Sequence, residues 1–296
     1  MKKYILMLLV LLLSLTACSN KKEETKENSM SASVKTVSVE NMEMDYIVFG
    51  EGEKSFIILP GLSIHSVMGS AELIAEAYKA FTDEYTIYVF DRAKNIKEGY
   101  TIKDMADDTA KAMKALNIEN ADIFGASQGG MIGLYLAIDY PELVHKMILG
   151  STAARTNNNF NNVVDEWINL AKQKEETKLL ESFVDNVYSE ATLNEYRDIL
   201  ISSNANISDE EYERFIILAE ACKDYDCYDE LSNIKCPVLV LGSKGDQVVG
   251  VDGSIEIGNA LNCEIYLYDE NYGHGVYDEA TDYKDRCLEF FNKYGC

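Results

Sequence analysis

The feature that most constrains the fold of this chain is a series of short apolar runs, separated by segments with helical periodicity. The runs cover residues 56–59, 87–90, 123–124, 147–149, 238–241 and 265–268. Continuous apolar runs are typical of parallel strands that are covered on both faces. Between two of them, Ile102, Met105 and Met113 recur at helical spacing, behind a capping box formed by Thr101 and Asp104. This alternation of strands and helices predicts an α/β fold with a mainly parallel sheet.

Further strands and helices are expected at both ends of this series. Residues 34–40 and 44–50 alternate between apolar and polar side chains, which predicts an antiparallel pair at one edge of the sheet. One helix is expected to follow Gly130 and to end before Pro141, because proline cannot continue a helix. The last helix is expected over residues 277–292.

The segment 155–224 breaks the alternation of strands and helices. It contains no strand pattern, and helical periodicity is found at 163–172, 179–187 and 211–222. The asparagine-rich run at 157–162 is expected to be a solvated loop. We therefore predict a helical insertion over the sheet, which divides the α/β core into residues 34–154 and 225–296.

The balance of charge excludes two kinds of partner. The chain carries 27 Lys and Arg residues against 50 Asp and Glu residues, a formal net charge of −23. A surface of this sign repels nucleic acid phosphates and anionic lipid headgroups, so we expect no nucleic acid partner and no electrostatic attachment to membranes. Hydrophobic residues make up 47% of the chain, which is ample for a large core.

The N-terminus has the pattern of an export signal. Two lysines precede an apolar run over residues 4–15, which is too short to span a bilayer comfortably and ends in L-T-A-C. The last four residues resemble the lipobox of bacterial lipoproteins, in which the cysteine is lipidated and the chain is cut before it. We expect a signal peptide at 1–17, a lipidated Cys18 and a flexible tether at 18–33, so that the protein is extracytoplasmic and attached to a bacterial membrane through its lipid only. An ordinary cleaved signal with an incidental cysteine is the alternative.

The other six cysteines lie in the last quarter of the chain, at Cys222, Cys227, Cys236, Cys263, Cys287 and Cys296. Such a set in an exported protein allows disulfides, and Cys236 and Cys263 each precede a predicted strand. Free buried thiols are the alternative, and the sequence leaves both open. No C-x-x-C motif has a partner pair, so we expect no zinc site.

The stretch G-A-S-Q-G-G at 125–130 places one serine where a strand is expected to become a helix. The residue at the apex of such a turn takes a strained backbone conformation, and its neighbours two positions away must be small to avoid clashes. This geometry exposes the serine oxygen at the end of the sheet, above the N-terminus of the helix. Ser127 is therefore the candidate nucleophile, and a tight structural turn that happens to hold a serine is the alternative.

A serine hydroxyl needs a base, and the chain has three histidines. His145 is expected at the end of the sheet opposite the strand tips. His65 is expected near the tip of the strand at 56–59. His274 lies in Y-G-H-G, in a loop after the run 265–268. It is the candidate base, because a loop at the tip of a neighbouring strand can reach the serine.

The base in turn needs a carboxylate that holds its tautomer. Asp246 follows V-L-V-L-G-S-K-G and so lies immediately past another strand tip. The chain order Ser127, Asp246, His274 is the order expected of α/β-hydrolases. Asp269 and Glu270 are the competing acids, but they are so close to His274 in sequence that they are less well placed to brace it.

From about residue 44 to its end, the sequence resembles the α/β-hydrolase superfamily. The matching stretches, in the family's order, are Y-I-V-F-G-E-G, L-P-G-L-S, G-A-S-Q-G-G, Y-P-E-L-V, C-P-V-L-V-L-G-S-K-G-D and Y-G-H-G. The resemblance implies an oxyanion hole made by the backbone N–H groups of Leu62 and Gln128. Two departures leave the subfamily open. Pro60-Gly61 stands where many members have His-Gly, and D-R-A-K-N stands where many have a glycine-rich turn.

A serine at this position of the family's motif implies acyl transfer without a cofactor or a metal. We expect a serine hydrolase that cleaves a small, mostly apolar carboxylic ester. The alternatives are an amidase or aminopeptidase, a lactonase, or a catalytically inactive binding lipoprotein. The helical insertion is similar to the cap that roofs the family's pocket, where His65 and Trp167 are candidate pocket residues. Four further aromatic residues could line the pocket or pack within the cap: Phe160, Phe183, Tyr188 and Phe215.

Overall fold

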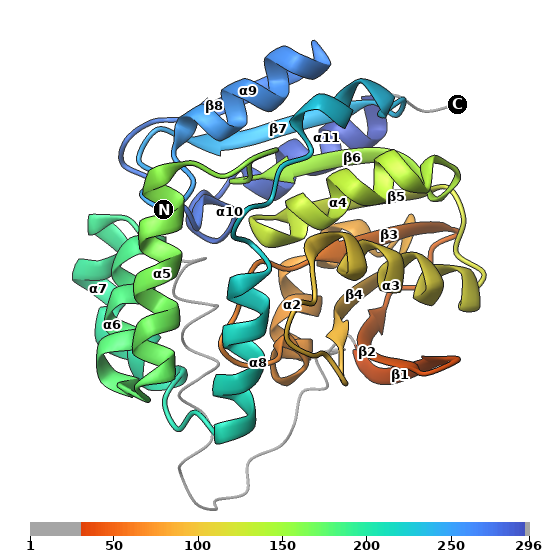
Figure 1. The fold of residues 1–296 in the computed structure, drawn as a ribbon. Coiled ribbons are helices and arrows are strands. Elements are labelled where there is room, and N and C mark those ends of the chain that lie inside the picture. Colours follow the sequence, from red (N-terminus) through yellow and green to blue (C-terminus); the bar gives the residue numbers. More distant parts are fainter. Residues whose placement is uncertain (1–30, 294–296) are drawn as a thin grey trace, which may run out of the picture.

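The computed structural model describes residues 31–293 and contains an eight-stranded sheet between two layers of helices (Figure 1). The strands are β1 (Ser33–Val39), β2 (Met42–Phe49), β3 (Lys54–Leu59), β4 (Tyr85–Ala93), β5 (Ala121–Ala126), β6 (Val144–Gly150), β7 (Val238–Ser243) and β8 (Glu264–Tyr268). Their order in the sheet is β1-β2-β4-β3-β5-β6-β7-β8. The pairs β1–β2 and β2–β4 are antiparallel, and the other neighbouring pairs are parallel. The predicted fold class and the antiparallel edge are confirmed, and every apolar run lies within a strand.

Helices cover both faces of this sheet. α3 (Ile102–Ala115), α4 (Gln128–Asp139) and α9 (Val251–Leu261) contribute to the buried cluster on one face, and α2 (Ala71–Ala77) and α11 (Tyr283–Lys293) to the cluster on the other. The last helix is interrupted, contrary to expectation. α10 (Val276–Glu279) ends at Ala280, which is extended, before α11 begins at Tyr283.

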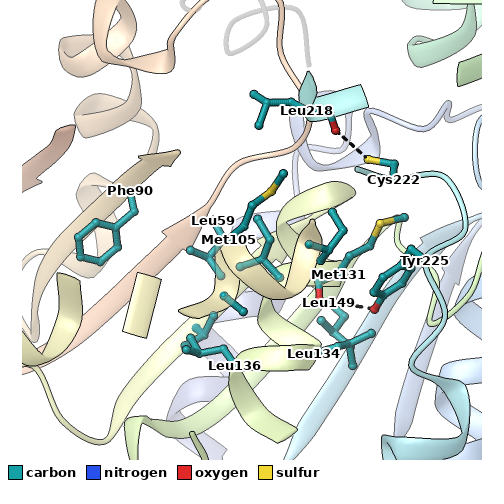
Figure 2. Close-up of a cluster of buried hydrophobic side chains, with 14 of the residues drawn as sticks. Leu59, Phe90, Met105, Met131, Leu134, Leu136, Leu149, Leu218, Cys222 and Tyr225 are labelled. Atoms are coloured by element: carbon teal, nitrogen blue, oxygen red, sulfur yellow. Dashed lines mark hydrogen bonds between the residues drawn. The ribbon is translucent and has the colours of Figure 1, made fainter. Parts of the chain in front are cut away.

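Buried side chains of α4, of β3 and β6 and of the chain at Tyr225 lie in one cluster (Figure 2). On the sheet side of the helix, Gly133 is close to the side chains of Leu59 and Leu149 on two strands. Elsewhere on the helix, the hydroxyl of Tyr225 donates to the carbonyl oxygen of Met131 at 3.5 Å. Because α4 is covered on both sides, its sequence is apolar around most of its circumference rather than along one stripe.

Four helices lie between β6 and β7, and we call them the cap: α5 (Asn158–Lys172), α6 (Glu176–Val187), α7 (Glu190–Ser203) and α8 (Asp209–Glu220). The asparagine-rich run is not a loop, because the side chain of Asn157 caps α5 by accepting from the N–H of Phe160 at 2.9 Å. α7 has no counterpart among the predicted helices. It buries Tyr196 alone, so its sequence carries no apolar stripe that periodicity could detect.

The cysteines that the structure describes are free thiols: Cys222, Cys227, Cys236, Cys263 and Cys287. Cys236 and Cys263 therefore form no disulfide with each other. Cys18, the signal peptide at 1–17 and Cys296 lie outside the described residues. Across residues 31–293, none of the helices has both the length and the apolar character needed to cross a bilayer.

Candidate active site

Ser127 lies at the turn between β5 and α4, with φ 51° and ψ −120°. Residues other than glycine rarely adopt this region, and such strain concentrates at functional sites. Its N–H donates to the carbonyl oxygen of Gly150 at 2.8 Å. A Cβ atom on Gly125 would lie 2.5 Å from the Gly129 oxygen, and one on Gly129 would lie 1.9 Å from the Leu59 oxygen. The close approach of α4 to the strands therefore requires both glycines.

His274 and Asp246 form a buried pair on the loops that follow β8 and β7. His274 Nδ1 lies 2.9 Å from Asp246 Oδ2, and the two residues are 3% and 7% exposed. Asp246 Oδ1 accepts from the N–H groups of Val248 at 2.8 Å and Val249 at 3.0 Å. These bonds fix the direction of the carboxylate toward the imidazole. The competing Asp269 instead binds a backbone amide of its own loop.

Ser127 and His274 border a single cavity of about 370 Å³ at the carboxyl ends of the strands. Leu62 and Gln128 border it as well, so the two segments predicted to supply oxyanion N–H groups lie next to the serine. The cap covers the cavity with a mostly apolar wall: Phe160, Val164, Trp167, Phe183, Val184 and Val187. The structure therefore combines a strained serine, a buried histidine–aspartate pair and a cavity with an apolar wall beneath the cap.

The two predicted pocket residues have different places in this structure. Trp167 borders the cavity, is 3% exposed and lies with its ring centroid 4.7 Å from that of Phe183. His65 is not among the described residues that border the cavity. Its Nδ1 lies 2.6 Å from Glu211 Oε1 and its Nε2 lies 2.9 Å from the Asn204 carbonyl oxygen, so its ring is turned toward α8 and the end of α7.

A buried guanidinium joins the two segments that carry the predicted oxyanion N–H groups. Arg92, at the end of β4, donates from Nη2 to the Pro60 carbonyl oxygen at 2.6 Å. Its Nε and Nη2 also donate to Gln128 Oε1, at 3.3 and 3.1 Å. Burial lowers the pKa of Arg92 to about 10, so the group stays charged at neutral pH. No local signal in D-R-A-K-N indicates that this side chain turns toward the serine.

The amide of Gln128 continues this network into the cap. Its Nε2 donates to the Leu218 carbonyl oxygen at 2.7 Å, in the last turn of α8, and to Cys222 Sγ at 3.0 Å, just after that helix. Nearby, Arg214 of α8 donates to Asp91 Oδ1 at 2.6 Å. The cap is therefore attached to the residue that follows the serine and to the strand end that supports it.

The arrangement of the strands, the tight turn at Ser127 and the cap defines an α/β-hydrolase fold. The family model described as alpha/beta hydrolase fold matches residues 55–281, and the chain belongs to this family. A relative from Rhizobium rhizogenes that carries the name carbamate hydrolase RutD is 25% identical over 254 residues, which is 80% of this chain and 92% of the relative. 3-Oxoadipate enol-lactonase 2 from Acinetobacter baylyi is 22% identical over 224 residues, 73% of this chain and 80% of the relative.

Solved structures agree on the fold. The alpha/beta hydrolase MGS-M2, from a Medee basin deep-sea metagenome library, superposes with a TM-score of 0.79 at 21% identity, covering 88% of this chain and 98% of that one. The enol-lactonase from Burkholderia xenovorans superposes with a TM-score of 0.76 at 18% identity, covering 87% and 100%. Family membership and the names of the sequence relatives together support hydrolase activity.

Proposed function

We propose that this protein is a serine hydrolase that cleaves small carboxylic esters through an acyl-enzyme intermediate. The observation that carries the proposal is the buried pair of His274 and Asp246, in which His274 borders the same cavity as the strained Ser127. A nucleophile, a base and a group that orients the base are the parts that acyl transfer requires.

The steps follow from these positions. His274 accepts the proton of Ser127 as Oγ attacks the carbonyl carbon of the ester. The N–H groups of Leu62 and Gln128 stabilise the negative charge that develops on the carbonyl oxygen. His274 then gives the proton to the departing alcohol, which leaves the acyl group on the serine. A water molecule, deprotonated by His274, attacks this acyl group, and the carboxylic acid departs as the serine recovers its proton.

The second candidate is a lactonase with the same residues in the same roles. It is favoured by the relative from Acinetobacter baylyi, whose name states that it acts on an enol-lactone. A lactone is a cyclic ester, so the attack and the oxyanion are the same, and the alcohol stays attached to the acyl group. A panel that contains open esters, lactones and carbamates of similar size separates these candidates by kcat/KM.

The proposal for the chemistry is tested by labelling the purified protein with a fluorophosphonate and measuring turnover of nitrophenyl esters of increasing acyl length. Labelling and turnover are expected in the unmodified protein and absent in Ser127→Ala. The control is Ser203→Ala, because Ser203 is an exposed serine on α7. A folded protein that neither labels nor cleaves any member of the panel would move the function to a binding lipoprotein.

We also propose that the mature protein begins at Cys18 and is held at a bacterial membrane, outside the cytoplasm, by lipid on that cysteine. The pattern L-T-A-C after an apolar run supports this location. Growth of expressing cells with a clickable palmitate analogue tests it. Incorporation is expected in the unmodified protein and lost in Cys18→Ser, and equal incorporation in both would refute the anchor.

A further inference from the structure

One end of the catalytic cavity is polar, in contrast to its apolar cap wall. Asp278 borders the cavity there, together with Tyr78, Tyr188 and Tyr277. The four residues come from three separate parts of the chain: Tyr78 follows α2, Tyr188 follows α6, and the other two lie in α10, shortly after His274. The fold therefore brings one carboxylate and three phenol rings to the same end of the chamber that holds the serine.

The carboxylate of Asp278 has no partner of its own. Within residues 31–293, no hydrogen bond and no ion pair uses its oxygens, although the residue is exposed at the cavity. The side chains around the cavity desolvate this carboxyl, which raises its pKa. Its neighbour Glu279 differs, because both Glu279 oxygens accept backbone N–H groups, from Ser189 at 2.8 Å and Gly273 at 2.7 Å. Asp278 is thus an accessible acid that the protein itself leaves unsatisfied.

Lys284 is the cation whose charge acts on Asp278, but its ammonium group is bound elsewhere. Its Nζ donates to the carbonyl oxygen of Tyr277 at 3.1 Å and lies 5.3 Å from the centre of the Tyr78 ring. Its charge lowers the pKa of Asp278 but does not outweigh burial. Lys284 does not border the cavity, and no described residue that borders it is a Lys or an Arg. An anionic substituent at this end would therefore meet a carboxylate and no cation.

The three tyrosines border the same cavity as this carboxylate and form no hydrogen bond with it among the described residues. Burial raises the pKa of each hydroxyl, and the charge of Asp278 adds to the effect in all three. No hydrogen bond among the described residues uses these hydroxyls. Aromatic faces attract organic cations, and rings grouped around one point are the usual protein site for substituted ammonium ions. A carboxylate among such rings adds a direct charge partner.

We propose that the Asp278 end of the cavity is a subsite for an organic ammonium group, so that the substrate is an ester carrying a positive charge on its acyl or its alcohol part. This inference rests on the proposed function for the reaction, but the subsite is also a binding site in its own right. The net charge of −23 acts in the same direction, because it raises the local concentration of cationic substrates.

Matched pairs of substrates test the subsite. The alcohol part is probed with acetylcholine and with its uncharged isostere, in which carbon replaces the quaternary nitrogen. The acyl part is probed with the nitrophenyl ester of a trimethylammonio fatty acid and with its carbon isostere. In at least one pair, kcat/KM is expected to favour the cation by roughly ten- to hundredfold. Asp278→Asn removes the preference, whereas Asp285→Asn, which removes the same charge from an exposed position on α11, keeps it.

The outcomes separate the subsite from the chemistry. If neutral esters are cleaved and neither pair shows a preference that depends on Asp278, the subsite is refuted and the hydrolase stands. If no ester is cleaved, the proposed hydrolase activity is refuted. Calorimetric titration with phenyltrimethylammonium then tests the cation subsite by itself. Binding that is lost in Asp278→Asn but kept in Asp285→Asn then supports it. Equal binding by the two variants, or none by the unmodified protein, refutes it.

Discussion

Two of the three histidine–carboxylate pairs that the structure describes, one in the core and one at the junction with the cap, have similar geometry and different surroundings. In the core, His274 Nδ1 lies 2.9 Å from Asp246, and the side chains are 4% and 2% exposed. At the junction, His65 Nδ1 lies 2.6 Å from Glu211, and the side chains are 28% and 32% exposed. The two pairs differ in the contacts of the second ring nitrogen, Nε2. His65 Nε2 is 2.9 Å from the Asn204 carbonyl oxygen, whereas no described hydrogen bond uses His274 Nε2.

This difference determines what each ring can do. A ring with an acceptor at both nitrogens satisfies both only when it carries two protons, so these contacts favour the imidazolium form of His65 and fasten the cap. His274 donates from Nδ1 to Asp246 and keeps Nε2 available to accept a proton beside the cavity. A neighbouring carboxylate therefore does not identify a catalytic base, because the free second nitrogen is also required.

The largest effect on kcat is expected from replacing His274, because this removes the ring nitrogen that accepts the serine proton. His274→Ala should lower kcat by about 10⁶-fold, as loss of a catalytic base does in serine hydrolases. His65→Ala should change kcat by only a few-fold, since that ring does not border the cavity. Steady-state kinetics of the two variants, with circular dichroism to establish folding, make the comparison. A folded His65→Ala protein as inactive as His274→Ala would contradict it.

The second effect concerns the acid that orients the base. Asp246→Asn should lower kcat by about 10⁴-fold, because an amide nitrogen facing Nδ1 favours the wrong tautomer. The N–H groups of Val248 and Val249 can still donate to the remaining oxygen, so the loop should keep its structure. Glu211→Gln at the other pair is the matched control, and its kcat should stay within a few-fold. Equal losses in both variants would remove the distinction between the pairs.

The third effect concerns Arg92, which joins the two segments that carry the predicted oxyanion N–H groups. Arg92→Lys should lower kcat by up to about 10²-fold, because an ammonium group cannot span the Pro60 and Gln128 oxygens as a guanidinium fork does. KM should change less than kcat. Affinity for a boronic acid that mimics the tetrahedral intermediate should fall in parallel with kcat/KM. An unchanged boronate affinity with reduced thermal stability would assign Arg92 a structural role only.

The smallest effect is the contribution of His65 and Glu211 to stability, about 1 kcal/mol or less because the pair is partly exposed. Burial lowers the pKa of His65, but the bonds to Glu211 and Asn204 outweigh it and leave the pKa above its usual 6.5. Burial likewise raises the pKa of Glu211, but hydrogen bonds from Ser208 and His65 outweigh it and bring the pKa from 4.5 to about 2.

The signs of these shifts define a pH window. A raised histidine pKa stabilises the fold below pH 6.5 and loses its effect as the pH rises through the folded value. A lowered glutamate pKa stabilises above pH 4.5 and loses its effect toward pH 2. His65→Gln should therefore reduce the free energy of unfolding most between pH 4.5 and 6.5, as urea titrations at several pH values can measure. A difference that grows above pH 7 would show that the ring is not held as an imidazolium.

Much of the core site could be predicted because its signals are local. Gly125 and Gly129 flank Ser127 in one short motif that the sequence shows, although the backbone that excludes a side chain at Gly129 is that of Leu59 on a neighbouring strand. Asp246 and His274 each follow an apolar strand, and the carboxyl ends of parallel strands meet at one edge of a sheet. A strand pattern therefore brings distant positions together without further information.

The cap carried weaker signals. α7 has one buried residue, and the asparagine-rich start of α5 is polar, so neither shows the apolar stripe of an amphipathic helix. The placement of His65 against Glu211 and Asn204 depends on how α7 and α8 sit over the loop after β3. The spacing of these residues along the chain does not predict that contact.

By itself, the sequence determined the α/β-hydrolase core, the edge strands and the three candidate residues at the strand tips, since each depends on periodicity or on a turn of a few residues. Only the tertiary structure decided that Arg92 joins the Pro60 carbonyl to the Gln128 side chain, that His65 fastens the cap, and that Asp278 borders the cavity together with three tyrosines. These contacts join side chains from separate elements. These contacts depend on the distances at which helices and loops pack, and residue spacing along the chain does not predict those distances.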